Sequence, residues 1–151
     1  MSNTYQRYAT DPVAIQNGTP VLFSDDMTIT IRGMRSDAVR AMQDRINKRN
    51  QQYYRSGSAL PTKVQDADQI DIAVAIINGW KGVTGPDGAA LEYTADAARQ
   101  LVTELPELRE QIIAAASMAE TFRVAALRAT TENLSSASAS NSNSAAAGAQ
   151  A

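Results

Sequence analysis

The sequence predicts a mainly α protein of the α+β class, with four helices, a small N-terminal antiparallel β element and a disordered C-terminal tail. Apolar residues recur with helical spacing through the middle of the chain, whereas one early segment alternates with a period of two. The last residues are almost entirely Ser, Ala and Asn. The 151 residues suit one ordinary domain. We therefore expect a flexible N-terminus over residues 1–12, one helical domain with its β element over 13–132, and the tail over 133–151.

The β element is expected directly after the polar N-terminus. In residues 27–32, Met and Ile alternate with Thr and Arg, which is typical of a half-buried strand. Residues 13–15 and 21–23 are short apolar stretches, and the turn dipeptide Asn17-Gly18 lies between them. Two or three short antiparallel strands are the natural interpretation. A sheet this small is marginal alone, so it must pack against helices.

Two helices should follow the β element. Ser36 suits an N-cap position, and the helix after it should run to about residue 54. A second helix should span about residues 66–78, with Asn78-Gly79 as its C-cap pair. The apolar stripe of this second helix is wide, which predicts burial on more than one side. Its members are Ala67, Ile70, Ala73, Val74, Ile76 and Ile77.

Two further helices are expected beyond the glycine-rich segment. Thr94 can cap the third helix, whose apolar face ends at Leu105. Pro106 belongs in the first turn of the fourth helix, where its missing N–H costs nothing. The fourth helix should run to about residue 131, with Leu108, Ile112, Ala115, Ala119 and Phe122 along one face.

Composition excludes several functions. The chain has no His and no Cys, so a Ser-His-Asp triad, a thiol nucleophile, a disulfide framework and a zinc finger are impossible. Fourteen basic residues against sixteen acidic ones give no positive surface for nucleic acid. We find no membrane span and no signal peptide, and therefore expect a soluble protein that stays in the compartment where it is made.

An acidic cluster formed by Asp66, Asp68 and Asp71 is the one candidate metal site. Its spacing lacks the glycine and the distal glutamate of a calcium loop. The interpretation we favour is a charged helix N-terminus, where carboxylates suit the helix dipole. We therefore expect no metal, no cofactor and no catalytic residue.

Trp80 has two interpretations that the sequence leaves open. It is the single tryptophan and is flanked by glycines, so it could seal a helix against a turn as a core residue. The alternative is that it anchors a partner, because tryptophan is enriched among interface hot spots. Phe122 has the same ambiguity. The alanines of the last helix would let a partner helix approach closely.

Residues 70–123 contain an ordered set of motifs. After an apolar helix the motifs read Gly79-Trp80-Lys81-Gly82-Val83, Pro86-Asp87-Gly88, Leu91-Glu92-Tyr93-Thr94 and Leu105-Pro106-Glu107-Leu108, before the final helix to Phe122. This order of an apolar helix, a tryptophan-glycine segment, an Asp-Gly turn and a helix pair broken at a proline resembles the tail assembly chaperones of long-tailed (siphovirus- and myovirus-type) bacteriophages. Tyr93 stands where the family commonly has phenylalanine, which keeps the aromatic character.

The resemblance implies a non-enzymatic protein that binds the tape-measure protein, keeps it soluble and helps recruit tail-tube subunits. It also implies location in the host cytoplasm and absence from the mature virion. Many family members exist in a short and a longer frameshifted form, so a longer form of this chain is a further expected partner. The residues we expect to bind partners are Trp80, Val83, Tyr93, Ile112 and Phe122.

Two alternatives remain open at this stage. The first is a structural virion protein, such as a head–tail adaptor or a tail-completion protein, since a β element with helices would suit that role too. The second is a small carboxylate- or magnesium-dependent enzyme, for which the three aspartates of the acidic cluster are the only support.

Overall fold

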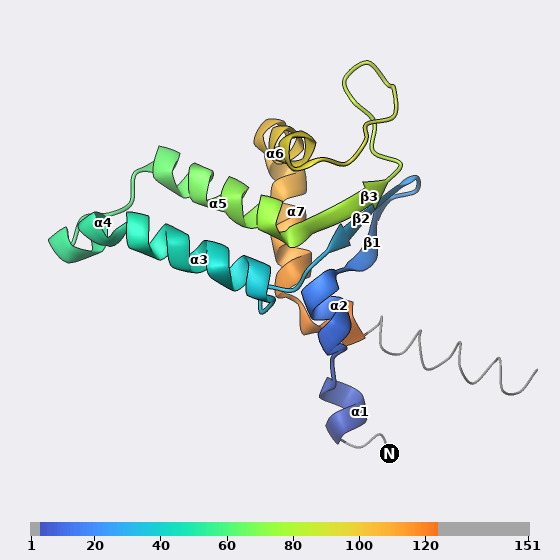
Figure 1. Cartoon of the computed structure of the whole chain (residues 1–151), viewed down its shortest axis with the longest axis horizontal. Coiled ribbons are helices and arrows are strands. Elements are labelled where there is room, and N and C mark those ends of the chain that lie inside the picture. Colours follow the sequence, from blue (N-terminus) through green and yellow to red (C-terminus); the bar gives the residue numbers. More distant parts are fainter. Residues whose placement is uncertain (1–3, 124–151) are drawn as a thin grey trace, which may run out of the picture.

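The structure, a computed structural model, describes residues 4–123, and the expected tail over 133–151 lies outside them. The described part is mostly helical with one small antiparallel sheet, which confirms the predicted fold class. Figure 1 shows a hairpin of two long helices on one side, the sheet on the other, and helix α7 crossing behind their junction. The N-terminal segment expected to be flexible contains the short helix α1 (Thr4–Tyr8).

The sheet has three strands in the order β1-β2-β3, and both pairs are antiparallel. β1 (Thr19–Ser24) and β2 (Met27–Ile31) form the hairpin predicted from residues 21–23 and 27–32. β3 is Ile77–Lys81, far away in sequence. β2 is the central strand, and its Ile29 and Ile31 are completely buried.

The prediction of a strand over residues 13–15 is wrong, because these residues belong to α2 (Pro12–Asn17). The Asp11 carboxylate oxygen Oδ1 accepts hydrogen bonds from the backbone N–H groups of Val13 (3.0 Å) and Ala14 (3.3 Å). Pro12 occupies the first turn, where a proline fits. The Asp-Pro pair is therefore a helix start, and this local capping outweighs the apolar content that indicated a strand.

The prediction of Asn78-Gly79 as a helix C-cap is also wrong. Helix α5 (Thr62–Ile76) passes directly into strand β3. Arg32, just after β2, takes over the capping: its Nη1 donates to the Ala75 carbonyl (3.0 Å) and its backbone N–H to the Ile76 carbonyl (2.7 Å). Arg32 thus satisfies two carbonyls at the C-terminal end of α5, and no glycine cap is needed.

Helix α3 (Asp37–Arg49) begins as predicted, with the Ser36 hydroxyl accepting a hydrogen bond from the Val39 N–H (3.4 Å). The helix expected to reach residue 54 is divided at Asn50, after which α4 (Gln51–Ser56) follows. The second long helix begins at Thr62, earlier than the expected residue 66. α3 and α5 lie side by side as an antiparallel hairpin (Figure 1).

The last two helices confirm both predicted starts. The Thr94 hydroxyl accepts a hydrogen bond from the Ala97 N–H (3.0 Å) at the start of α6 (Ala95–Glu104). Pro106 opens α7 (Pro106–Ser117). α7 ends at Ser117, not near residue 131, because Met118 is extended; residues 119–123 are helical again, and 124–131 lie outside the described residues.

One apolar core joins all these elements. α7 packs against α5, α6 and β2, so the core lies between the sheet and the helices. Within residues 4–123, no helix is long and apolar enough to cross a bilayer. The buried members of the core are Ile29, Ile31, Val39, Ala73, Ile76, Ile77, Val83, Ala98, Leu101, Val102, Ile112 and Ala116.

Candidate partner-binding surface

Trp80 and Tyr93, two of the expected partner-binding residues, contact each other. Their rings pack edge to face with centroids 5.1 Å apart. The Trp80 indole N–H donates to the Leu91 carbonyl (2.7 Å), and the Tyr93 hydroxyl donates to the Ile77 carbonyl (3.1 Å). Trp80 lies on β3, not at a helix end, and is half-buried. The pair therefore fastens Leu91 and Tyr93, at the end of the loop that follows β3, to strand β3.

The other three expected residues are buried. Val83 and Ile112 belong to the core, with 3% and 0% of their surface exposed. Phe122 is 2% exposed and lies against Gly33, together with Ile15 of α2. The structure thus unites Trp80 and Tyr93 but does not bring all five residues to one surface. Partner binding by these residues stays a prediction.

A groove of about 850 Å³ lies between the β1–β2 turn, the segment that follows β3, and the corner between α6 and α7. We call it the acidic groove. Leu105, 47% exposed, stands at the α6–α7 corner, and the exposed carboxylates are Asp26, Glu104 and Glu107. The remaining lining residues are Ser24, Met27, Gly82, Val83, Thr84, Leu101, Pro106, Leu108 and Gln111.

Gly82 brings two walls of the acidic groove together. Its φ of +76° lies in the left-handed region, and a Cβ on it would stand 1.7 Å from the Asp26 carbonyl oxygen. The β1–β2 turn can therefore pack against the segment after β3 only because residue 82 has no side chain.

Arg109 fixes the α6–α7 corner from inside. The side chain is 7% exposed, and its Nη1 donates to the Val102 carbonyl (3.0 Å), one of the last carbonyls of α6. A cation at a helix C-terminus also suits the helix dipole. Its Nε has no hydrogen-bond partner among the described residues.

Of the five residues that the sequence predicted to bind partners, Val83 alone lines the acidic groove. A signal was available in the chain, because Leu105 stands between two glutamates beside a proline that begins a helix. The sequence analysis places Leu105 on the apolar face of the third helix, whereas the structure leaves 47% of its surface exposed. The contribution of the β1–β2 turn, by contrast, depends on the packing of distant segments.

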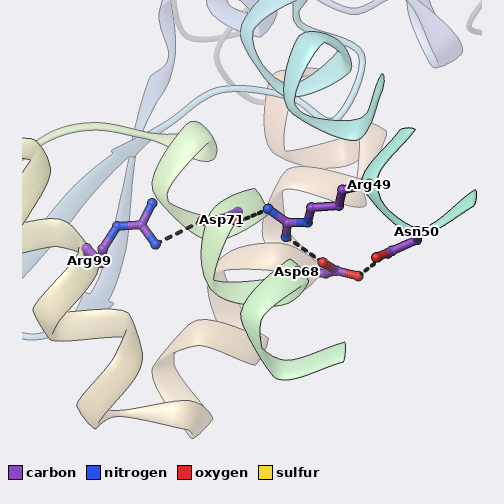
Figure 2. A network of polar contacts seen from close by, with 5 residues as sticks. All are labelled: Arg49, Asn50, Asp68, Asp71 and Arg99. Atoms are coloured by element: carbon purple, nitrogen blue, oxygen red, sulfur yellow. Dashed lines mark hydrogen bonds and ion pairs between the residues drawn. The ribbon is translucent and has the colours of Figure 1, made fainter. Parts of the chain in front are cut away.

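The acidic cluster is not a charged helix N-terminus, because α5 begins at Thr62 and has no acidic residue in its first turn. Figure 2 shows Asp68 and Asp71 pointing to arginines from two other helices. Arg49 of α3 pairs with both aspartates, at 2.8 Å from Asp71, and Arg99 of α6 pairs with Asp71 at 2.8 Å. Asn50 Nδ2 donates to the second Asp68 oxygen at 2.7 Å.

This network holds three helices together. Burial tends to raise the pKa of Asp71, but the hydrogen bonds from Arg49 and Arg99 outweigh it and hold that pKa below its usual value. The bonds to Asp68 and Asp71 raise the pKa of Arg49. Both arginines are nearly half exposed, so water screens these pairs. In the part of the chain that the structure covers, no three acidic residues are arranged to hold a metal ion.

The chain matches a known protein family. The family model described as YdaY prophage protein matches residues 34–133, about two thirds of the chain. The matched range includes α3, the network of Figure 2 and the α6–α7 side of the acidic groove. No curated protein and no solved structure matches the chain.

Proposed function

This chain belongs to the YdaY prophage protein family and is therefore phage-derived, and from this premise we propose that it is a tail assembly chaperone. In this role it binds the tape-measure protein, keeps it soluble and helps recruit tail-tube subunits. It acts in the host cytoplasm, is absent from the finished virion and catalyses no reaction. A longer frameshifted form of the chain would join it on the same client.

The observation that carries the proposal is the ordered set of motifs over residues 70–123, found in a phage-derived chain. These motifs build one continuous part of the fold. α5 runs into β3, the Trp80–Tyr93 pair fastens the next segment to the sheet, and the proline-broken helices α6 and α7 close the core. A groove with an apolar floor and an exposed leucine supports protein binding.

Weak contacts suffice for this role. A tape-measure protein is long, so many chaperone molecules can bind along one client. Neighbouring sites on one filament raise the effective concentration, and the total binding then exceeds the affinity of a single contact.

Co-expression with the tape-measure protein encoded in the same prophage tests the proposal. We expect most of the tape-measure protein to be soluble when this chain is present and aggregated when it is absent. A matched control expresses an unrelated small helical protein at the same level. Equal solubility of the tape-measure protein with and without this chain would refute the proposal.

Mass spectrometry of purified virions separates the chaperone from a structural role. We expect this chain to be missing from mature particles. Its presence at the stoichiometry of a ring would instead favour a head–tail adaptor or a tail-completion protein.

A further inference from the structure

The acidic groove carries charge of a single sign. Asp26, Glu104 and Glu107 line it, and within residues 4–123 no Lys or Arg does. This contrasts with the chain as a whole, in which 14 basic and 16 acidic residues nearly balance. A segment with Lys or Arg beside its apolar residues would therefore complement the groove.

The floor of the groove offers apolar contact. Met27 and Leu108 are partly buried, Val83 is buried, and Leu105 leaves 47% of its surface in water. An apolar side chain placed against Leu105 would remove that surface from water, which favours binding.

The shape of the groove exists before any partner arrives. The Gly82–Asp26 approach joins the two β-sheet walls, and Arg109 ties the α6–α7 corner through the Val102 carbonyl. Such preorganisation lowers the cost of ordering the site on binding.

The backbone that borders the groove favours a helix over an added strand. Met27 belongs to the central strand β2, which pairs on both sides, and the Val83 carbonyl accepts a hydrogen bond from the Leu91 N–H (2.9 Å). Strand addition would require unpaired backbone groups at these residues.

We propose that the acidic groove binds an amphipathic helix of a partner polypeptide. One apolar stripe of this helix lies on Leu105 and Leu108, and its flanking Lys or Arg side chains face Glu104, Glu107 and Asp26. The inference rests on the proposed function for the identity of the partner, which is the tape-measure protein. The recognition chemistry comes from the groove alone.

A synthetic peptide of about 18 residues, or five helical turns, tests the recognition chemistry. It carries leucines at helical spacing with lysines on both sides, and a fluorescent label reports its binding to the full chain. We expect the double variant Glu104→Lys/Glu107→Lys to weaken binding by about tenfold or more, since it opposes like charges. Added salt should weaken binding to the original chain as well.

One matched control and one further test variant keep the result specific. Glu92→Lys/Glu110→Lys changes the same charge at exposed positions outside the groove and should bind the peptide like the original chain. Leu105→Ser removes the apolar contact without changing charge and should also weaken binding. Absence of binding to the original chain, or equal binding by both double variants, would overturn the inference.

The same double variants in the co-expression assay separate the two proposals. If Glu104→Lys/Glu107→Lys solubilises the tape-measure protein as well as the original chain does, the groove assignment fails and the chaperone function stands. If the solubility of the tape-measure protein is the same with and without the original chain, while the leucine-lysine peptide binds the groove, the chaperone function fails and the binding site stands.

Discussion

Replacing Gly82 with alanine should destabilise the fold strongly, because two separate costs meet at this position. The first is conformational: a φ of +76° places alanine in the left-handed region, at a cost of about 1 kcal/mol. The second is steric: the new Cβ would stand 1.7 Å from the Asp26 carbonyl oxygen, so backbone must move. Overpacking of this kind costs about 1–3 kcal/mol, which gives a total of about 2–4 kcal/mol.

Gly57 and Gly88 provide matched controls for the steric part. Their φ values are +68° and +80°, and apart from the glycine itself and its two chain neighbours no heavy atom of the described residues lies within 4 Å of a Cβ built on either. Alanine at these sites should therefore cost only the conformational part, about 1 kcal/mol.

Urea unfolding followed by circular dichroism measures all three variants against the original chain. With the usual dependence of stability on urea, we expect the Gly82→Ala midpoint to lie about 1 M below those of the two controls. If Gly82→Ala and the controls agree within about 0.5 kcal/mol, the close approach of the β1–β2 turn is not a feature of the folded protein.

Substitutions at three further positions test the internal contacts. Asp71→Asn should flatten the pH dependence of stability. The pKa of Asp71 is lowered in the folded state, so its carboxylate stabilises the fold at pH values above the unfolded pKa of about 3.9. This stabilisation is lost as the pH falls through the folded pKa of Asp71. Urea titrations between about pH 7 and pH 2.5 measure this, and equal acid sensitivity of variant and original would contradict it. Arg109→Ala should cost about 2–3 kcal/mol, because the buried Val102 carbonyl loses its donor; thermal unfolding reports it, and an unchanged midpoint would exclude the tie between α6 and α7. Thr94→Ala should cost about 1 kcal/mol by loss of the α6 cap, whereas Thr94→Ser should restore most of it.

The predicted site shows where sequence reasoning works in this protein and where it stops. The contacts of Trp80 agree with the interpretation of this residue as part of the packed structure. Its indole N–H and the Tyr93 hydroxyl both donate hydrogen bonds to backbone carbonyls inside the chain. The aspartates at 66, 68 and 71 differ only by their neighbours: two meet arginines from α3 and α6, and Asp66 remains exposed. No spacing within α5 contains that information, since the arginines belong to other helices.

Local chemistry in the sequence determined the helix starts at Ser36, Thr94 and Pro106 and the hairpin strand that begins at residue 27, because caps and alternation depend on neighbours a few residues away. Tertiary structure alone decided that 77–81 is a strand, since pairing with β2 and capping by Arg32 act across more than forty residues. Tertiary structure also forms the acidic groove, because two of its walls meet where Gly82 lies against the Asp26 backbone. Contacts between distant segments depend on how the whole chain packs, and no local pattern encodes them.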